Sequence, residues 1–168
     1  MIRSINGKTP KIADSAFVSE AAYVVGDVEI GENTSIWPGA VIRADFGRIR
    51  IGNNTLIEDN CVLHSADSLE IGDNVVVGHS VVVHCRIIKN NTLIGNNSTV
   101  LDGAEIGSLC VIAAGSVVTP GTKIPDNSFV VGVPAKIRAG AHSQIQERLE
   151  KGPGAYHELA RQYKEQGL

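Results

Sequence analysis

Three of the five histidines in this 168-residue chain lie close together, at His64, His79 and His84. The surrounding segment, from Ile57 to Ile88, is otherwise rich in aliphatic side chains. Neutral imidazole is the commonest protein ligand of divalent transition metals such as Zn²⁺. The three histidines are therefore candidate ligands of one metal ion, provided that the fold brings them together.

An aliphatic residue recurs about every six positions and defines the elements that must position these histidines. The recurring residues are Ile12, Val18, Val24, Ile30, Ile36, Ile42, Ile51, Ile57, Leu63, Ile71, Val77, Val83, Ile88, Ile94, Val100, Ile106, Ile112, Val118, Ile124 and Val130. A small or β-branched residue stands four positions after most of them, and Gly often follows directly. This repeat is typical of an all-β parallel β-helix, in which stacked rungs bury one continuous core.

The stacking of rungs predicts which polar side chains meet. Hexapeptide repeats resemble the left-handed triangular β-helix, which has three rungs to a turn, so that positions three rungs apart lie on neighbouring strands about 4.8 Å apart. On this count His84 stacks on His64, and Arg43 precedes His64 by one turn in the same column. His79 follows Val77 by two residues and is expected on the adjacent face, pointing away from the pair.

A metal–imidazole bond is about 2.1 Å long, so His79 of the same chain cannot reach a metal held by the other two histidines. If three copies pack side by side, His79 of one chain can complete a three-histidine site with His64 and His84 of a neighbour. The count therefore predicts one metal site at each interface between subunits.

The repeat changes its period beside this column. The intervals Ile42–Ile51 and Leu63–Ile71 are longer than six residues, and the interval Val83–Ile88 is shorter. Functional side chains are often carried on loops that a regular scaffold positions. We therefore expect two loops, one in each longer interval, that shape a site near the histidines.

The whole chain is long enough for one domain. Its net charge of −3 argues against nucleic acid or an anionic membrane as the main partner. The chain has no apolar run long enough to span a membrane and no signal-peptide pattern, so a cytoplasmic location is expected. Cys61 and Cys110 fall on small inward positions, whereas Cys85, beside His84, is a weaker candidate for a ligand or redox role.

Three segments are expected within the domain. Residues 1–11 form an N-terminal cap with a turn at Asn6 and Gly7, residues 12–136 form the β-helix, and residues 137–168 form a helical extension. In the extension, helical spacing on either side of a Gly-Pro-Gly break predicts two short amphipathic helices laid along the prism, with His142 and His157 at the surface. The single tryptophan, Trp37, is expected to point outward into an interface.

Several motifs together resemble the γ-class carbonic anhydrase family of hexapeptide-repeat proteins. They are WPGAVIRAD at 37–45, EDNCVLH at 58–64, IGDNVVVGH at 71–79, VVHC at 82–85, VLDGAEIG at 100–107 and GVPAK at 132–136. The match extends over essentially the whole chain. Its specific part is the histidine spacing with Arg43 and Asp45 upstream, because acyltransferases of the same fold share GVPAK and the repeats.

The resemblance implies a homotrimer whose metal sites take His64 and His84 from one subunit and His79 from the next. The implied metal is Zn²⁺, with Fe²⁺ or Co²⁺ as alternatives. Three neutral imidazoles leave the cation an open position, which lowers the pKa of bound water to about 7. The resulting metal-bound hydroxide would attack CO2 to give bicarbonate.

Further roles follow from the same resemblance. Arg43 and Asp45 match a pair that forms an intersubunit salt bridge, with Arg43 steadying bicarbonate, and Asp59 matches a position that lines the site. The chain has Glu58 where the family usually has Gln, and Leu56 where it often has Asn. Glu58 could accept the proton of the bound water or could itself bind the metal. The acidic loop of the fully active members is absent, and many short members of the family that lack it have weak or no hydratase activity.

Two other functions are compatible with the repeats. One is an acyltransferase or thioesterase acting on an acyl-CoA, in which a single histidine at a subunit interface serves as general base. The other is a scaffold without catalysis, in which the three histidines are structural. Bound zinc would favour the metal site, whereas saturable binding of acetyl-CoA would favour the acyltransferase.

Overall fold

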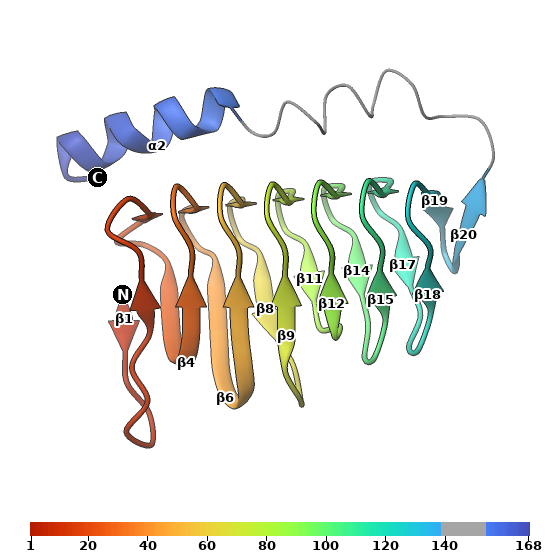
Figure 1. Ribbon diagram of the computed structural model, residues 1–168, viewed down its shortest axis with the longest axis horizontal. Coiled ribbons are helices and arrows are strands. Elements are labelled where there is room, and N and C mark those ends of the chain that lie inside the picture. The colour runs from red at the N-terminus through yellow and green to blue at the C-terminus, as the bar shows by residue number, and fades with distance from the viewer. Residues whose placement is uncertain (139–153) are drawn as a thin grey trace.

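A computed structural model describes residues 1–138 and 154–168 and confirms the predicted parallel β-helix. Short strands coil around one axis, and a helix, α2 (Gly154–Gln166), lies along the outside of the coil (Figure 1). All of the strand pairs between successive turns are parallel, and β20 joins β19 as an antiparallel hairpin that ends the coil. No helix in the part of the chain that the structure describes combines the length and apolarity needed to cross a membrane.

The strands form two sheets. The 12-stranded sheet consists of β1 (Ile2–Arg3), β2 (Lys11–Ile12), β4 (Tyr23–Ile30), β6 (Val41–Ile51), β8 (Val62–His64), β9 (Leu69–Ile71), β11 (Val82–Val83), β12 (Ile87–Ile88), β14 (Thr99–Val100), β15 (Glu105–Ile106), β17 (Val117–Val118) and β18 (Lys123–Ile124). The 8-stranded sheet consists of β3 (Phe17–Val18), β5 (Ser35–Ile36), β7 (Leu56–Ile57), β10 (Val76–Val77), β13 (Leu93–Ile94), β16 (Val111–Ile112), β19 (Phe129–Gly132) and β20 (Ala135–Arg138).

The 12-stranded sheet supplies two faces of a three-sided prism, because β4 and β6 each continue around a corner. We call the β8, β11, β14 and β17 side the first face, the β9, β12, β15 and β18 side the second face, and the 8-stranded sheet the third face. The first half of β6 pairs with β8 and its second half pairs with β9. Residues that share a column on one face therefore come from successive turns of the coil.

The predicted inward residues form the core. From Val24 to Val130 the recurring aliphatic residues are buried, whereas Ile12 and Val18, near the open N-terminal end, are only partly buried. Cys61 and Cys110 are fully buried at small inward positions, as predicted. The repeat thus identifies the core residues from the sequence. Burial of the inward residues is less complete at the N-terminal end, where a neighbouring turn is missing.

Both longer intervals depart from the regular coil, as predicted, the first as a bulge within β6 and the second as a loop. In the first interval β6 bulges away from β4: Ala44 pairs with Gly26 and Ile49 pairs with Val28, so four residues of β6 stand opposite Asp27 alone. The bulge begins where the backbones of Gly26 and Ala44 lie close together. Gly26, at φ +93°, permits this close approach, since a Cβ there would lie 2.2 Å from the carbonyl oxygen of Ala44. Residues 65–68, between β8 and β9, do form a loop.

The second of the two predicted helices is confirmed as α2, and it covers part of the third face. The first, which was expected to begin near Ala141, lies outside the described residues, as does His142.

Trp37 points outward as predicted but is only 5% exposed, because Phe17, Tyr156 and Tyr163 surround its ring. The cover over Trp37 is thus this chain's own C-terminal helix rather than a neighbouring subunit. The N-terminal residues begin with β1, which pairs with β4, and the chain turns at Asn6 and Gly7.

Candidate metal centre

His64 and His84 lie side by side on the first face. His64 ends β8 and His84 follows β11, and the two strands pair with Val83 opposite Leu63. Nδ1 of His64 lies 3.1 Å from Nε2 of His84, and the side chains are 14% and 27% exposed. The stacking predicted from the rung count is therefore confirmed, and two ring nitrogens converge on one point near the surface.

Arg43 and Asp45 extend this column by one turn. Arg43 pairs with His64 in the register of β6 and β8, as the rung count predicts. Its guanidinium forms an ion pair with Asp45 of the same chain, and Oδ1 of Asp45 lies 3.0 Å from Nε2 of His64. The implied salt bridge between subunits is therefore, in this structure, a contact within one chain.

The charge on Asp45 is stabilised by these contacts. Partial burial opposes ionisation, but hydrogen bonds from Arg43 and His64 outweigh it and hold the pKa of Asp45 below its usual value. Asp45 is therefore an anion at neutral pH. An anion at this place favours a ring N–H of His64 that points towards it, which leaves Nδ1 of a neutral ring free to bind a cation.

Asp102 is a site residue that the sequence reasoning missed. It follows β14, and its Oδ1 lies 2.9 Å from Nδ1 of His84. The signal was present in the sequence, because Val100 stands one turn after Val83 and Asp102 therefore falls close to His84 in the stack. Counting one further turn beyond His84 places Asp102 near the pair, but its position in a turn leaves the direction of its side chain undetermined by the repeat.

His79 lies apart from this pair, in the turn between β10 and β11. Its Nε2 is 3.2 Å from Oε2 of Glu58 and its Nδ1 is 3.2 Å from Oδ2 of Asp59. Glu58 is only 6% exposed. The structure thus brings His79 together with Glu58 and Asp59 at the corner between the third and first faces, and apart from His64 and His84, as the rung count predicts for His79.

Cys85 takes no part in either group. It is fully buried, and burial raises the pKa of its thiol to about 12. At this position Cys85 is a core residue on the inward side of the chain, and the imidazole of His84 is on the outward side. A buried, protonated thiol offers neither a metal ligand nor a reactive thiolate, so the weaker ligand or redox hypothesis for Cys85 finds no support.

The pair of converging nitrogens fits a divalent cation. Two ligands each about 2.1 Å from a tetrahedral metal are about 3.4 Å apart, so the 3.1 Å between the two ring nitrogens is near the separation that one shared metal requires. The remaining nitrogen of each ring contacts a carboxylate, which is the usual arrangement behind a metal-binding histidine. Within the described residues of one chain, no three His, Cys, Asp or Glu side chains form a complete ligand set.

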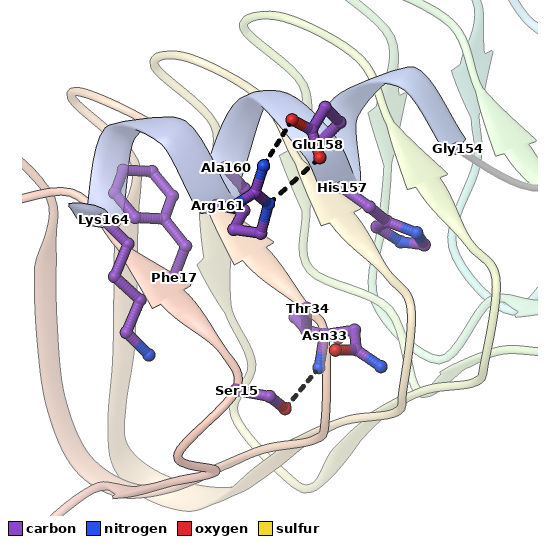
Figure 2. Close-up of a pocket in the computed structure, with 10 residues that line it drawn as sticks. All are labelled: Ser15, Phe17, Asn33, Thr34, Gly154, His157, Glu158, Ala160, Arg161 and Lys164. Atoms are coloured by element: carbon purple, nitrogen blue, oxygen red, sulfur yellow. Dashed lines mark hydrogen bonds and ion pairs between the residues drawn. The ribbon is translucent and has the colours of Figure 1, made fainter. Parts of the chain in front are cut away.

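A cavity of about 520 Å³ lies elsewhere, between α2 and the corners of the first turns (Figure 2). Its lining includes Ser15, Asn33, His157 and Arg161, and none of the residues proposed for the site. His157, expected at the surface, is half-buried here, and its Nε2 has no hydrogen-bond partner. The cavity is therefore separate from the histidine pair.

Comparison with known proteins places the chain in a family. A protein of Geobacillus kaustophilus named carbonic anhydrase is 44% identical over 169 residues, which cover 99% of this chain and 89% of that relative. This chain belongs to the γ-class carbonic anhydrase-like family of hexapeptide-repeat proteins. The mitochondrial gamma carbonic anhydrase 2 of Arabidopsis thaliana is 38% identical over 80% of this chain, which spans only 51% of that relative's length.

The γ-class family shares its scaffold with transferases. A family model described as bacterial transferase hexapeptide (six repeats) matches residues 9–44 and 87–120. The crystal structure of a hexapeptide transferase family protein from Anaplasma phagocytophilum has a TM-score of 0.92 at 36% identity, covering 96% of this chain and 97% of that chain. The β-helix alone therefore does not decide between the two chemistries.

The two departures from the γ-class pattern have different surroundings. Glu58 contacts His79, so this exchange falls within the candidate site. Leu56 is 1% exposed and packs with Phe17, Trp37 and Ala160 in the cluster beneath α2. Leu56 is thus tied to the attachment of α2, and Glu58 is the departure that bears on chemistry.

Proposed function

We propose that this protein is a metal-dependent γ-class carbonic anhydrase-like enzyme that converts CO2 to bicarbonate at sites shared between subunits of a homotrimer. The observation that carries the proposal is the 3.1 Å separation of the two ring nitrogens of His64 and His84, each ring being contacted on its other side by a carboxylate. Membership of the family supports the same conclusion.

His64 and His84 of one subunit and His79 of a neighbour would hold the metal, which we propose to be Zn²⁺, with Fe²⁺ or Co²⁺ as alternatives. When bound, such a cation acidifies a water to a pKa of about 7 and so supplies a nucleophile at neutral pH. To bind, His79 must exchange its contact with Glu58 or Asp59 for the metal. Asp59, at Nδ1 of His79, would then orient the ring through the nitrogen that does not bind.

The remaining residues act on substrate and proton. The Arg43 guanidinium, 44% exposed beside His64, would hold the negative charge that develops on bicarbonate. Asp45 keeps Arg43 and His64 in place through one carboxylate. Glu58 is nearly buried and contacts His79 of its own chain, so it would reach the shared site together with that histidine, and its Oε2 would accept the proton released as CO2 is hydrated.

The three faces of the prism differ in a way that supports the trimer. Outward valines stack along the first face beside the histidines, and two of them, Val62 and Val82, are 39% and 37% exposed. The second face instead carries ion pairs, among them Arg50 with Glu29 and Arg86 with Glu105. The third face is partly covered by α2. The apolar first face is therefore the one suited to contact another copy, with His79 at its edge.

Metal content and activity on one sample test the proposal. We expect about one zinc, iron or cobalt ion per chain in protein purified without chelator, together with hydration of CO2 in stopped-flow measurements. Metal without hydration would show that the ligands serve another reaction. No metal in a correctly folded protein would contradict the proposal.

An acyltransferase is the second candidate, because a solved relative of nearly the same length and fold is named as a hexapeptide transferase family protein. In that case one imidazole oriented by a carboxylate, such as His64 with Asp45, would act as general base. This candidate gives no role to His84 so close to His64. Saturable binding of acetyl-CoA in titration calorimetry, without bound metal, would favour it.

A further inference from the structure

Four side chains form a row across successive turns of the β-helix. Asp45, His64, His84 and Asp102 follow one another, and the nearest side-chain atoms of neighbours in the row are separated by 3.0, 3.1 and 2.9 Å. Each imidazole therefore contacts one carboxylate and the other imidazole. The row has a carboxylate at each end and two ring nitrogens facing each other at its centre.

This order determines which nitrogen of each ring carries a hydrogen. A carboxylate can only accept a hydrogen bond, so Nδ1 of His84 donates to Asp102 and Nε2 of His64 donates to Asp45. In neutral rings the two central nitrogens then both present lone pairs, 3.1 Å apart. Two lone pairs at this distance repel each other, and a cation that both can bind removes the repulsion.

We propose that Asp102 is a positioning residue that fixes His84 in the tautomer with hydrogen on Nδ1, so that Nε2 is the atom that binds the metal. This inference rests on the proposed function, because it takes His84 to be a ligand. Carboxylates behind metal-binding histidines typically account for 10–100-fold in metal affinity. The Asp102 side chain is 62% exposed, so water competes for the hydrogen bond, and we expect about tenfold, the low end of that range.

Three variants separate this role from a general effect of charge. Asp102→Ala removes the acceptor, and we expect about tenfold weaker Zn²⁺ binding in competition with a chromophoric chelator. Asp102→Asn keeps an amide oxygen that can accept from Nδ1, and its affinity should return to near that of the native protein. Asp67→Ala is the matched control, because exposed Asp67 lines the same groove as Asp102. Equal affinities in Asp102→Ala and Asp67→Ala would overturn the proposal.

A second readout needs no metal. Nitrogen-15 NMR of the metal-free native protein should show His84 with hydrogen on Nδ1 and a bare Nε2, and Asp102→Ala should lose this preference. The opposite tautomer in the native protein would overturn the inference. If the tautomer is as proposed but even the native protein fails to bind Zn²⁺, the proposed metal centre is wrong. The inference that Asp102 fixes the tautomer of His84 would still be supported.

Discussion

The histidine column shows how backbone register determines which side chains can act together. The contact between His64 and His84 was predictable because both follow inward residues that the repeat places one turn apart. Asp102 was not predicted because it lies in the turn after β14, where the direction of a side chain no longer follows the alternation of a strand. The contact of His79 with both Glu58 and Asp59 likewise depends on the geometry of a corner.

Glu58→Gln tests the proposed proton acceptor. The exchange restores the residue that the γ-class family usually has and keeps the size of the side chain while removing its basicity. Because general base catalysis typically contributes 10²–10⁴-fold, we expect the rate of CO2 hydration to fall by at least about tenfold at unchanged metal content. A rate that stays the same or rises would show that Glu58 obstructs the site rather than serving it.

The three cysteines should be inert in the folded protein. All three are fully buried, and burial raises the pKa of Cys61 and Cys85 to about 12 and also raises that of Cys110. The reactive thiolate is therefore scarce at pH 8 and becomes common only as the pH approaches those raised values. We expect iodoacetamide at pH 8 to modify none of them before unfolding and all of them in urea, as measured by intact mass. Rapid modification of Cys85 in the folded state would contradict its placement in the core.

At the scale of elements, one corner of the prism repeats a backbone conformation that the hexad pattern does not specify. Successive turns place a residue with positive φ there, between the second and third faces. These residues are Asn33, Asn54, Asn74, Asn91, Leu109 and Asn127. Asparagine tolerates this left-handed conformation better than other residues with a side chain. Leu109, at φ +56°, is the exception in the column.

Leu109→Asn should therefore stabilise the protein. The left-handed conformation costs an ordinary L-residue roughly 1–2 kcal/mol. We expect the free energy of unfolding to rise by about 1 kcal/mol, as measured by urea unfolding, because Asn relieves part of that cost. The reverse exchange, Asn91→Leu, is the matched control and should lower it by a similar amount. A loss of stability in Leu109→Asn would mean that the leucine side chain gains more from packing than its backbone loses.

The repeat predicted the inward residues of the strands but not how the outer elements complete them. The segment 44–50 breaks the hexad period as a bulge within β6. Ala44 before the bulge pairs with β4, Ile49 and Arg50 after it pair with β4 and β9, and Ile49 is buried in the core. Trp37 could be assigned to the outside from its position, but its cover comes from α2 at the other end of the chain. Contacts between distant segments depend on packing that a local pattern does not contain.

At the scale of the whole molecule, the contrast between the three faces predicts how copies assemble. Val62→Asp would place a charge on the apolar first face, where it is tolerated by a single exposed chain but costly when buried in an interface. We expect this variant to elute as a monomer, by light scattering, and to lose bound metal. Ile87→Asp, on the second face, is the matched control and should remain a trimer. A trimeric Val62→Asp would mean that another surface forms the interface.

The central claim is that each metal centre takes ligands from two chains, and subunit mixing tests it most directly. His79→Ala and His64→Ala should each fold, form trimers and bind no metal. After the two are unfolded together and reassembled in equal amounts, about a quarter of the interfaces pair an intact His79 with an intact His64 and His84, so about a quarter of the native metal content should return. Absence of metal in trimers shown to contain both variants would contradict a shared site, as would stoichiometric metal in His79→Ala alone.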